Sequence, residues 1–297
     1  MDKVGVVINP LSGGGAAARI EPWLRLRLGN RLEMLEVRAG VDVAAWARRC
    51  GELGFERIVV IGGDGTFRSV AAAMLGLETP VGLIPAGTNN NIAAVLGLPT
   101  EQHEAAEMAL QDEAQWISAG RIGNYVFFEG AGVGLEADLW PLGEAVVRRN
   151  FRELLDAPLE LAQDRGVDLK IQLDDQTLTV RAFTLSISNT PMTGAHFKLA
   201  PGVDIRDPRL FMTVYHDLGR IKLLLAAPAL QRGHQGHGYK AVRYPFMHAR
   251  VEASRQLHVH ADGTLICSLP VEIEAIPKAV RVPFPPQAAE FTLGAAS

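Results

Sequence analysis

Residues 59–67 read VVIGGDGTF, an apolar run that ends abruptly in three glycines around one aspartate, Asp64. The β-branched start is typical of a buried strand, and the glycines predict a tight turn whose backbone can approach a ligand closely. A helix that begins after the turn would offer free N–H groups to anionic oxygens. A carboxylate suits such a place only beside a cation or a substrate hydroxyl. The stretch therefore predicts a site for a phosphate chain with its metal ion; the alternative is a tight turn whose aspartate caps a helix.

Further apolar runs flank this stretch and alternate with helical patterns. The expected strands are 4–10, 31–38, 57–63 and 81–87. The expected helices are 16–28, 42–53 with Asp42 as its cap, 66–75 and one that opens at Thr88 or Asn89. Unbroken apolar strands separated by helices imply a parallel sheet covered on both faces. Ligands bind at the carboxyl ends of such strands, where the Gly-rich loops of this chain also lie.

The sequence changes in character after about residue 120, where strand-like segments with partial alternation follow one another. LDDQTL at 173–178 is a plausible hairpin turn, and one helical pattern at 142–165 interrupts the strands. This half is expected to be a mostly antiparallel β domain, a sandwich rather than a barrel. The expected organisation is an α/β domain at 1–120, a β-rich domain at 121–282, and a Pro- and Ala-rich tail at 283–297 that could pack back on the first domain.

The composition excludes several classes of protein. Of 297 residues, 48% are hydrophobic and 21% charged, and the formal net charge of −4 argues against non-specific nucleic-acid binding. The two cysteines, Cys50 and Cys267, are far apart in the sequence, which argues against a disulfide framework and favours a reducing cytoplasm. The short apolar run before Pro10 does not predict a signal peptide, and the longest later apolar stretch, 221–230, is too short to span a bilayer. We expect a cytoplasmic protein that could still contact the inner face of the membrane.

Two further loops complete the pattern around the aspartate. NPLSG at 9–13 follows the first expected strand, and PAGTNN at 85–90 follows the fourth. The order and spacing of NPxSG, GGDGT and PxGTxN resemble those of the diacylglycerol kinase-like lipid kinases, which include sphingosine and ceramide kinases and the bacterial soluble lipid kinases. NAD kinases share GGDGT but lack the PxGT stretch, and are the more distant resemblance.

The resemblance extends into the second half and so covers nearly the whole chain. GAGVG at 130–134 looks like the family's G-x-G turn, and ADG at 261–263 looks like its late D-G turn. Asn189, the pair Ala200-Pro201 and Asp207 look like its substrate-side loop.

The resemblance implies a two-domain enzyme that binds ATP at the glycine loops, with Mg²⁺ bridging the phosphates. The γ-phosphate would pass to a lipid hydroxyl at a membrane surface. Asp64 and Asp262 would be catalytic, and Asp207 would belong to a metal loop. The implied nucleotide-binding residues are Asn9, Ser12, Gly62, Gly63, Gly65, Thr66, Gly87, Thr88 and Asn90. A homodimer is compatible with this reading, and a nucleic-acid partner is not expected.

Three positions depart from the family pattern by lacking an acidic residue. Ser69 stands where a Glu usually follows the GGDGT turn, Asn91 where Asp is frequent, and Thr264 where the late turn reads D-G-E. Losing one general base typically costs about two to four decades of rate. Two functions therefore stay open: an active lipid kinase, and a nucleotide- or lipid-binding protein of the same fold without transfer activity. A kinase for a soluble alcohol or nucleotide is a third.

Overall fold

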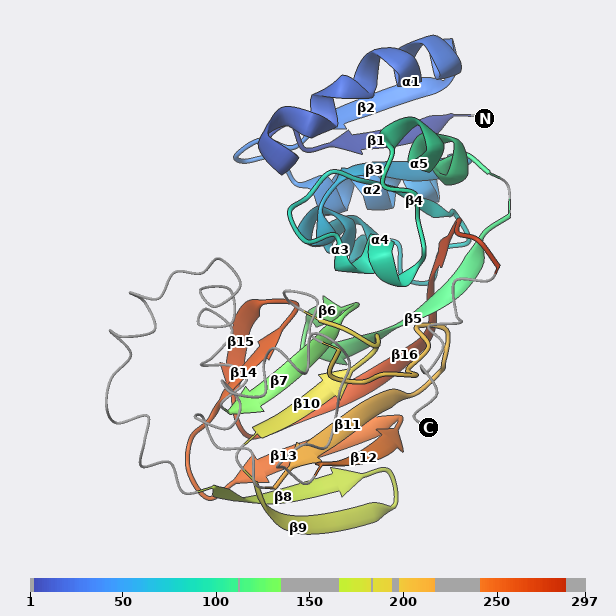
Figure 1. Cartoon of the computed structure of the whole chain (residues 1–297). Coiled ribbons are helices and arrows are strands. Elements are labelled where there is room, and N and C mark those ends of the chain that lie inside the picture. The colour runs from blue at the N-terminus through green and yellow to red at the C-terminus, as the bar shows by residue number, and fades with distance from the viewer. Residues whose placement is uncertain are drawn as a thin grey trace. The chain divides into compact units, whose positions relative to one another are not determined.

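The structure is a computed structural model that describes residues 3–111, 113–134, 166–182, 184–193, 198–216 and 241–286 (Figure 1). The chain forms two compact units. The first comprises the residues up to Ser118 and a segment that begins at Lys278, and the second is Ala119–Pro277. The helix expected at 142–165 and most of the tail lie outside the described residues. None of the helices in the described part of the chain is long and apolar enough to cross a membrane.

The first unit contains the expected parallel sheet, which is therefore confirmed. Its order is β2-β1-β3-β4, formed by β1 (Val4–Ile8), β2 (Leu32–Glu36), β3 (Arg57–Gly62) and β4 (Val81–Pro85). Every residue of β1 and β3 is buried, as their unbroken apolar runs predict. The sheet places the carboxyl ends of β1, β3 and β4 side by side at one edge.

Helices cover both faces of this sheet. The described helices are α1 (Glu21–Leu28), α2 (Val43–Glu52), α3 (Asp64–Ala73), α4 (Asn91–Val95) and α5 (Gln102–Ala109), with a 3₁₀ segment, η1, at Ser12–Arg19. One face of the sheet packs its valines and isoleucines against η1, α1 and α5. On the other face, a Cβ at Gly5 of β1 would meet Trp46 of α2 at 3.1 Å.

Several helices begin where the sequence did not place them. The helix expected at 16–28 is divided into a 3₁₀ segment that ends at Arg19 and helix α1, which begins at Glu21 with Pro22 in its first turn. Helix α4 begins at Asn91, because Asn90 before it has φ 52 and is left-handed. The expected cap of α2 is confirmed, since the Asp42 carboxylate accepts from Ala45 N at 2.9 Å.

Helix α5 was not anticipated. Its apolar face consists of small residues, Ala105, Ala106 and Ala109, all buried. A Cβ at Gly82 of β4 would lie 2.7 Å from the Ala109 carbonyl oxygen, so the helix approaches the strand closely. The buried Arg57 guanidinium donates to the same carbonyl at 3.3 Å, a cation at a helix C-terminus.

The second unit is built from two six-stranded sheets, ordered β12-β11-β10-β7-β14-β15 and β6-β5-β16-β13-β8-β9. The strands are β5 (Gln115–Ile122), β6 (Tyr125–Phe127), β7 (Gly130–Gly134), β8 (Val167–Leu173), β9 (Gln176–Ala182), β10 (Thr184–Ser188), β11 (Leu210–Tyr215), β12 (Ala241–Phe246), β13 (His248–Ala253), β14 (His258–Ala261), β15 (Thr264–Ser268) and β16 (Val271–Val282). Their pairing is antiparallel, and the predicted LDDQTL turn joins β8 to β9.

A shared core lies between the two sheets of the second unit. Ile171 and Val251 of one sheet and Leu185 and Met212 of the other belong to a single buried cluster. Strand β8 alternates buried and exposed residues along its whole length, as a strand with one face on a core must. The expected antiparallel β-sandwich is therefore confirmed.

Candidate active site

Three Gly-rich loops follow the strands that end at one edge of the parallel sheet. The first loop is 9–15, the second is 62–66 and the third is 85–90. Asn9 Nδ2 donates to Thr66 Oγ1 at 3.3 Å, which joins the first loop to the second. The Ala86 N–H donates to the Gly62 carbonyl oxygen at 2.9 Å, which joins the third loop to the second. The structure thus brings the loop residues singled out in the sequence together.

Glycine is required where the loops touch. A Cβ at Gly13 would lie 2.5 Å from the Ala86 carbonyl oxygen, and one at Gly87 would lie 2.5 Å from Gly63 Cα. A side chain at either position would force two backbones apart. Glycines that the sequence suggested for ligand approach therefore also serve the approach of one loop to another.

The first loop has the backbone conformation of an anion site. Ser12 is helical, and the glycines after it have φ of 57°, 64° and 93° at Gly13, Gly14 and Gly15. A right-handed residue followed by left-handed ones turns successive N–H groups toward one side, and such concavities bind phosphate oxygens. Only glycine takes these conformations without strain.

Asp64 links the second loop to the third. Its Oδ2 accepts from Asn91 N at 3.1 Å and its Oδ1 accepts from Ile92 N at 3.0 Å. These amides open α4, so Asp64 caps that helix and not the helix it begins. The bonds use part of the acceptor capacity of the carboxylate, which has about four lone-pair sites. Asp64 is thus a positioning group for the third loop.

Asn90 stabilises the third loop from within. Its Oδ1 accepts from Gly87 N at 2.8 Å, and its Nδ2 donates to Gly87 O at 3.0 Å. Asparagine tolerates its left-handed φ better than other side chains do. Its amide is therefore bonded to the loop itself, whereas the neighbouring Thr88 is exposed.

In the second unit, Asp262 anchors a neighbouring segment. Its carboxylate accepts from Phe128 N at 2.8 Å, Glu129 N at 3.0 Å and Gly130 N at 3.1 Å. Asp262 and Gly263 have φ of 44° and 73°, the left-handed pair typical of a two-residue hairpin, here between β14 and β15. The bonds give Asp262 a positioning role within its unit.

Asp207 is paired with an arginine. Arg209 donates to its carboxylate from Nε at 3.0 Å and from Nη2 at 2.9 Å. Hydrogen bonding from Arg209 holds the pKa of Asp207 below its ordinary value. Within the described ranges no three His, Cys, Asp or Glu residues gather as metal ligands. A metal ion at Asp207 would have to displace the guanidinium.

The pairing of Asp207 predicts a pH effect. Because the pKa of Asp207 is lower in the folded than in the unfolded state, the ion pair stabilises the fold above the unfolded value of 3.8. This contribution is lost as the pH falls through the folded value. We expect Arg209→Gln to raise the pKa of Asp207, measured by carboxyl NMR titration. Arg206→Gln, whose arginine pairs with Asp204, should leave the Asp207 titration unchanged. An unchanged pKa in Arg209→Gln would contradict the assignment.

The positions that lack an acid have ordinary structural roles. Ser69 Oγ donates to Gly65 O at 3.0 Å within α3. Asn91 is buried, and its backbone N–H donates to Asp64. Thr264 is exposed at the start of β15. None of the three side chains supplies the missing charge.

Sequence reasoning missed Glu129, the one carboxylate among the buried side chains of the described residues, with 6% exposure. Its Oε2 lies 3.5 Å from Thr193 Oγ1, which is also buried. The available signal was a single acid within the apolar run YVFFEGAGVG at 125–134.

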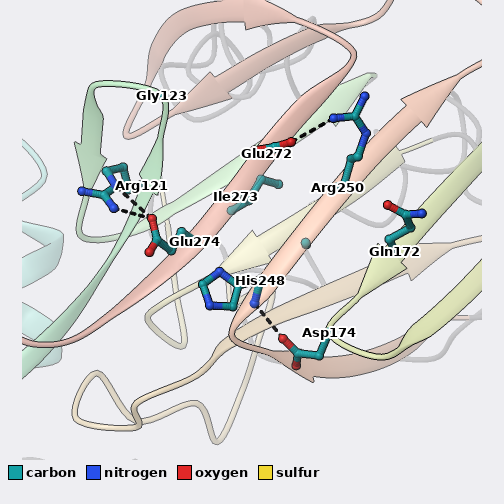
Figure 2. A pocket seen from close by; sticks show the side chains of 10 residues that line it. Arg121, Gly123, Gln172, Asp174, His248, Arg250, Glu272, Ile273 and Glu274 are labelled. Atoms are coloured by element: carbon teal, nitrogen blue, oxygen red, sulfur yellow. Dashed lines mark hydrogen bonds and ion pairs between the residues drawn. The ribbon is translucent and has the colours of Figure 1, made fainter.

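A hollow of about 430 Å³ lies over the sheet of the second unit that contains β5, β13 and β16 (Figure 2). Charged side chains from β5, β13 and β16 line it, and they neutralise one another. Arg250 pairs with Glu272 at 2.8 Å, and Arg121 pairs with Glu274. Exposed pairs of this kind contribute little and are ordinary for a solvated sheet face. We assign this hollow no ligand.

Two family models match the chain. Residues 3–122 match the diacylglycerol kinase catalytic domain, and residues 145–284 match the YegS C-terminal NAD kinase beta sandwich-like domain. A diacylglycerol kinase of Mycobacterium tuberculosis is 29% identical over 94% of each chain, and one of Bacillus subtilis is 23% identical over 98% of this chain and 99% of its own. A solved diacylglycerol kinase from Bacillus anthracis shares the fold, with a TM-score of 0.74, 17% identity and 96% and 97% coverage of the two chains.

These matches give the chain the two domains of a kinase-type phosphotransferase, an α/β catalytic domain and a β-sandwich domain. The chain belongs to the diacylglycerol kinase-like family of lipid kinases.

Proposed function

We propose that this chain transfers the γ-phosphoryl group of ATP to the hydroxyl of a lipid, as a peripheral cytoplasmic protein at a membrane surface. The observation that carries the proposal is the mutual contact of three Gly-rich loops at one edge of the parallel sheet. Their bare amides and left-handed glycines suit a triphosphate. The names of the bacterial relatives favour a diacylglycerol-like acceptor, with a sphingoid base as the other candidate.

The loop residues take distinct roles in this proposal. Gly13, Gly14 and the start of α3 hold phosphate oxygens, and Thr66, oriented by Asn9, donates a hydroxyl to them. Bound Mg²⁺ would neutralise charge that develops on the phosphates during transfer. Asp64 is the sole acid of the three loops, and Mg²⁺ is commonly held by one or two carboxylates together with phosphates and waters. The residues present therefore fit the ion, with Asp64 as its protein partner.

The experiment is a transfer assay with labelled ATP and Mg²⁺ on vesicles that contain diacylglycerol, a sphingoid base or phosphatidylglycerol. We expect labelling of one lipid class and its loss in Asp64→Asn. Asparagine keeps one acceptor for the α4 amides, and an unchanged melting temperature would separate chemistry from folding. Full transfer by this variant would remove Asp64 from the mechanism.

The second candidate is a nucleotide- or lipid-binding protein without transfer activity. It is favoured by the engagement of Asp64, Asp207 and Asp262 with protein donors and by the absence of acids at Ser69, Asn91 and Thr264. ATP binding without labelling of any lipid or soluble alcohol would support this candidate over the kinase.

Gly65→Ala tests ligand approach separately from folding. A Cβ at Gly65 would meet no protein atom, and the residue lies in the first turn of α3. Alanine should therefore leave the fold intact and could stabilise it by up to about 1 kcal/mol. We expect weaker ATP binding, by about tenfold, because only the ligand can collide with the added methyl. Calorimetric titration with ATP measures this, and unchanged affinity would place the phosphates away from Gly65.

A further inference from the structure

The buried carboxylate of Glu129 lies at one end of the sheet that contains β7, β10 and β14. Gly130 at the start of β7 pairs with Ser188 at the end of β10, and Ala131 pairs with Ala261 at the end of β14. These three strands therefore bring Glu129, residues 189–193 and the Asp262 turn to one place within the second unit.

The backbone of Glu129 is held on both sides. Its N–H donates to Asp262, and its carbonyl oxygen accepts from Asn189 N at 3.0 Å and Thr190 Oγ1 at 3.2 Å. Asn189 Nδ2 also donates to the preceding carbonyl, that of Phe128, at 2.7 Å. A side chain on so well-anchored a backbone has a defined direction, which is what a binding site requires.

Glu129 orients the hydroxyl of Thr193. Thr193 Oγ1 donates to Glu129 Oε2 across a contact of 3.5 Å. This uses the one hydrogen of the hydroxyl and leaves its lone pairs available. Thr193 can then accept a hydrogen bond from another group.

Thr193 lines a small hollow in which such a donor could lie. The hollow measures about 10 Å³ and is bounded by Gly130, Gly132, Thr193, His260, Asp262 and Gly263. This is close to the smallest space that holds one water molecule. The hollow therefore has room for a single hydroxyl but not for a ring or a phosphate.

We infer that this hollow binds the alcohol of the acceptor, with Thr193 as the contacting residue and Glu129 as its positioning residue. The inference rests on the proposed function and deepens it, since it names the residue that hydrogen-bonds the alcohol of the substrate. The ligand chemistry is an alcohol O–H, supplied by a lipid headgroup or by a free polyol.

The test measures binding without ATP, so it does not depend on phosphoryl transfer. Protein is titrated with vesicles that contain diacylglycerol and with vesicles that contain its methyl ether, which lacks the O–H. We expect wild type to bind the free alcohol about tenfold more tightly, the worth of one hydrogen bond. Equal binding to both vesicles would overturn the inference and would mean that the hollow holds water only.

Variants assign the preference to this hollow. Thr193→Val keeps the shape and removes the hydroxyl, and should abolish the tenfold preference, whereas Thr193→Ser should keep it. Glu129→Gln should reduce it, because an amide can donate as well as accept and so no longer dictates which way the Thr193 hydroxyl points. Glu272→Gln removes an exposed carboxylate of the same unit and should have no effect. A preference that survives Thr193→Val would overturn the inference.

A competition experiment with a soluble polyol distinguishes the two sources of the alcohol. Competition by free glycerol at concentrations that leave the vesicles intact would assign the hollow to polyols in general. Insensitivity to glycerol, with the tenfold preference intact, would assign it to lipid headgroups. Wild type that prefers the alcohol but labels no lipid with ATP would refute the proposed function and leave the alcohol site standing.

Discussion

Gly87→Ala is expected to weaken ATP binding by at least about a hundredfold and to destabilise the first unit by about 1–3 kcal/mol. The added Cβ would lie 2.5 Å from Gly63 Cα and 2.8 Å from Asn90 Oδ1. The first of these is a backbone atom, which cannot rotate away. The second and third loops must therefore separate, and the triphosphate loses amides from both at once.

A matched control separates loop geometry from loss of stability. Gly82 lies on β4, the strand that leads into the third loop, and its Cβ would lie 2.7 Å from the Ala109 carbonyl oxygen. Gly82→Ala should destabilise the same unit without moving the loops. Thermal unfolding and ATP titration of both variants provide the comparison. Equal ATP affinity in Gly87→Ala and wild type would contradict the assignment of the loops to the nucleotide.

Asp262→Ala is expected to destabilise the second unit by about 3 kcal/mol or more. Three backbone N–H groups, those of Phe128, Glu129 and Gly130, would lose their acceptor, and each unsatisfied buried group costs about 1–3 kcal/mol. Alanine would also have to take the left-handed φ of 44° at this position, which adds about 1 kcal/mol of strain.

Asp262→Asn is the matched variant. Asparagine tolerates the left-handed conformation and keeps one acceptor oxygen, so a smaller loss of stability is expected. Urea unfolding measures the loss, and amide hydrogen exchange should show faster exchange at Phe128, Glu129 and Gly130. An unchanged urea midpoint in Asp262→Ala would mean that these bonds contribute nothing to stability.

Short-range patterns in the sequence predicted several local structures: a strand, a helix cap and a turn. The buried strand at 57–62 follows from an unbroken β-branched run, and the Asp42 cap follows from an aspartate before an amphipathic stretch. The turn at Asp174 follows from turn residues between two alternating segments. Each of these signals depends on residues a few positions apart, so the sequence alone contains it.

The partners of the site residues could not be read in this way. Asp64 bonds to amides 27 and 28 positions later, and Asp262 bonds to amides more than 130 positions earlier. The sequence suggested proton transfer or metal binding for these carboxylates, and a metal role for Asp207. The structure gives each of them a neighbouring donor within the protein. Nothing in local periodicity reports such a neighbour.

The sequence by itself determined the parallel sheet, the antiparallel sandwich and the identity of the three loops, because alternation, apolar runs and glycines act over a few residues. Only the tertiary structure decided that Gly87 must be bare to let Gly63 approach, that Asp64 caps α4, and that Glu129 is buried beside Thr193. These depend on which strand ends meet in space. The packing of whole helices and strands decides which strand ends come together, and no short stretch of sequence encodes that packing.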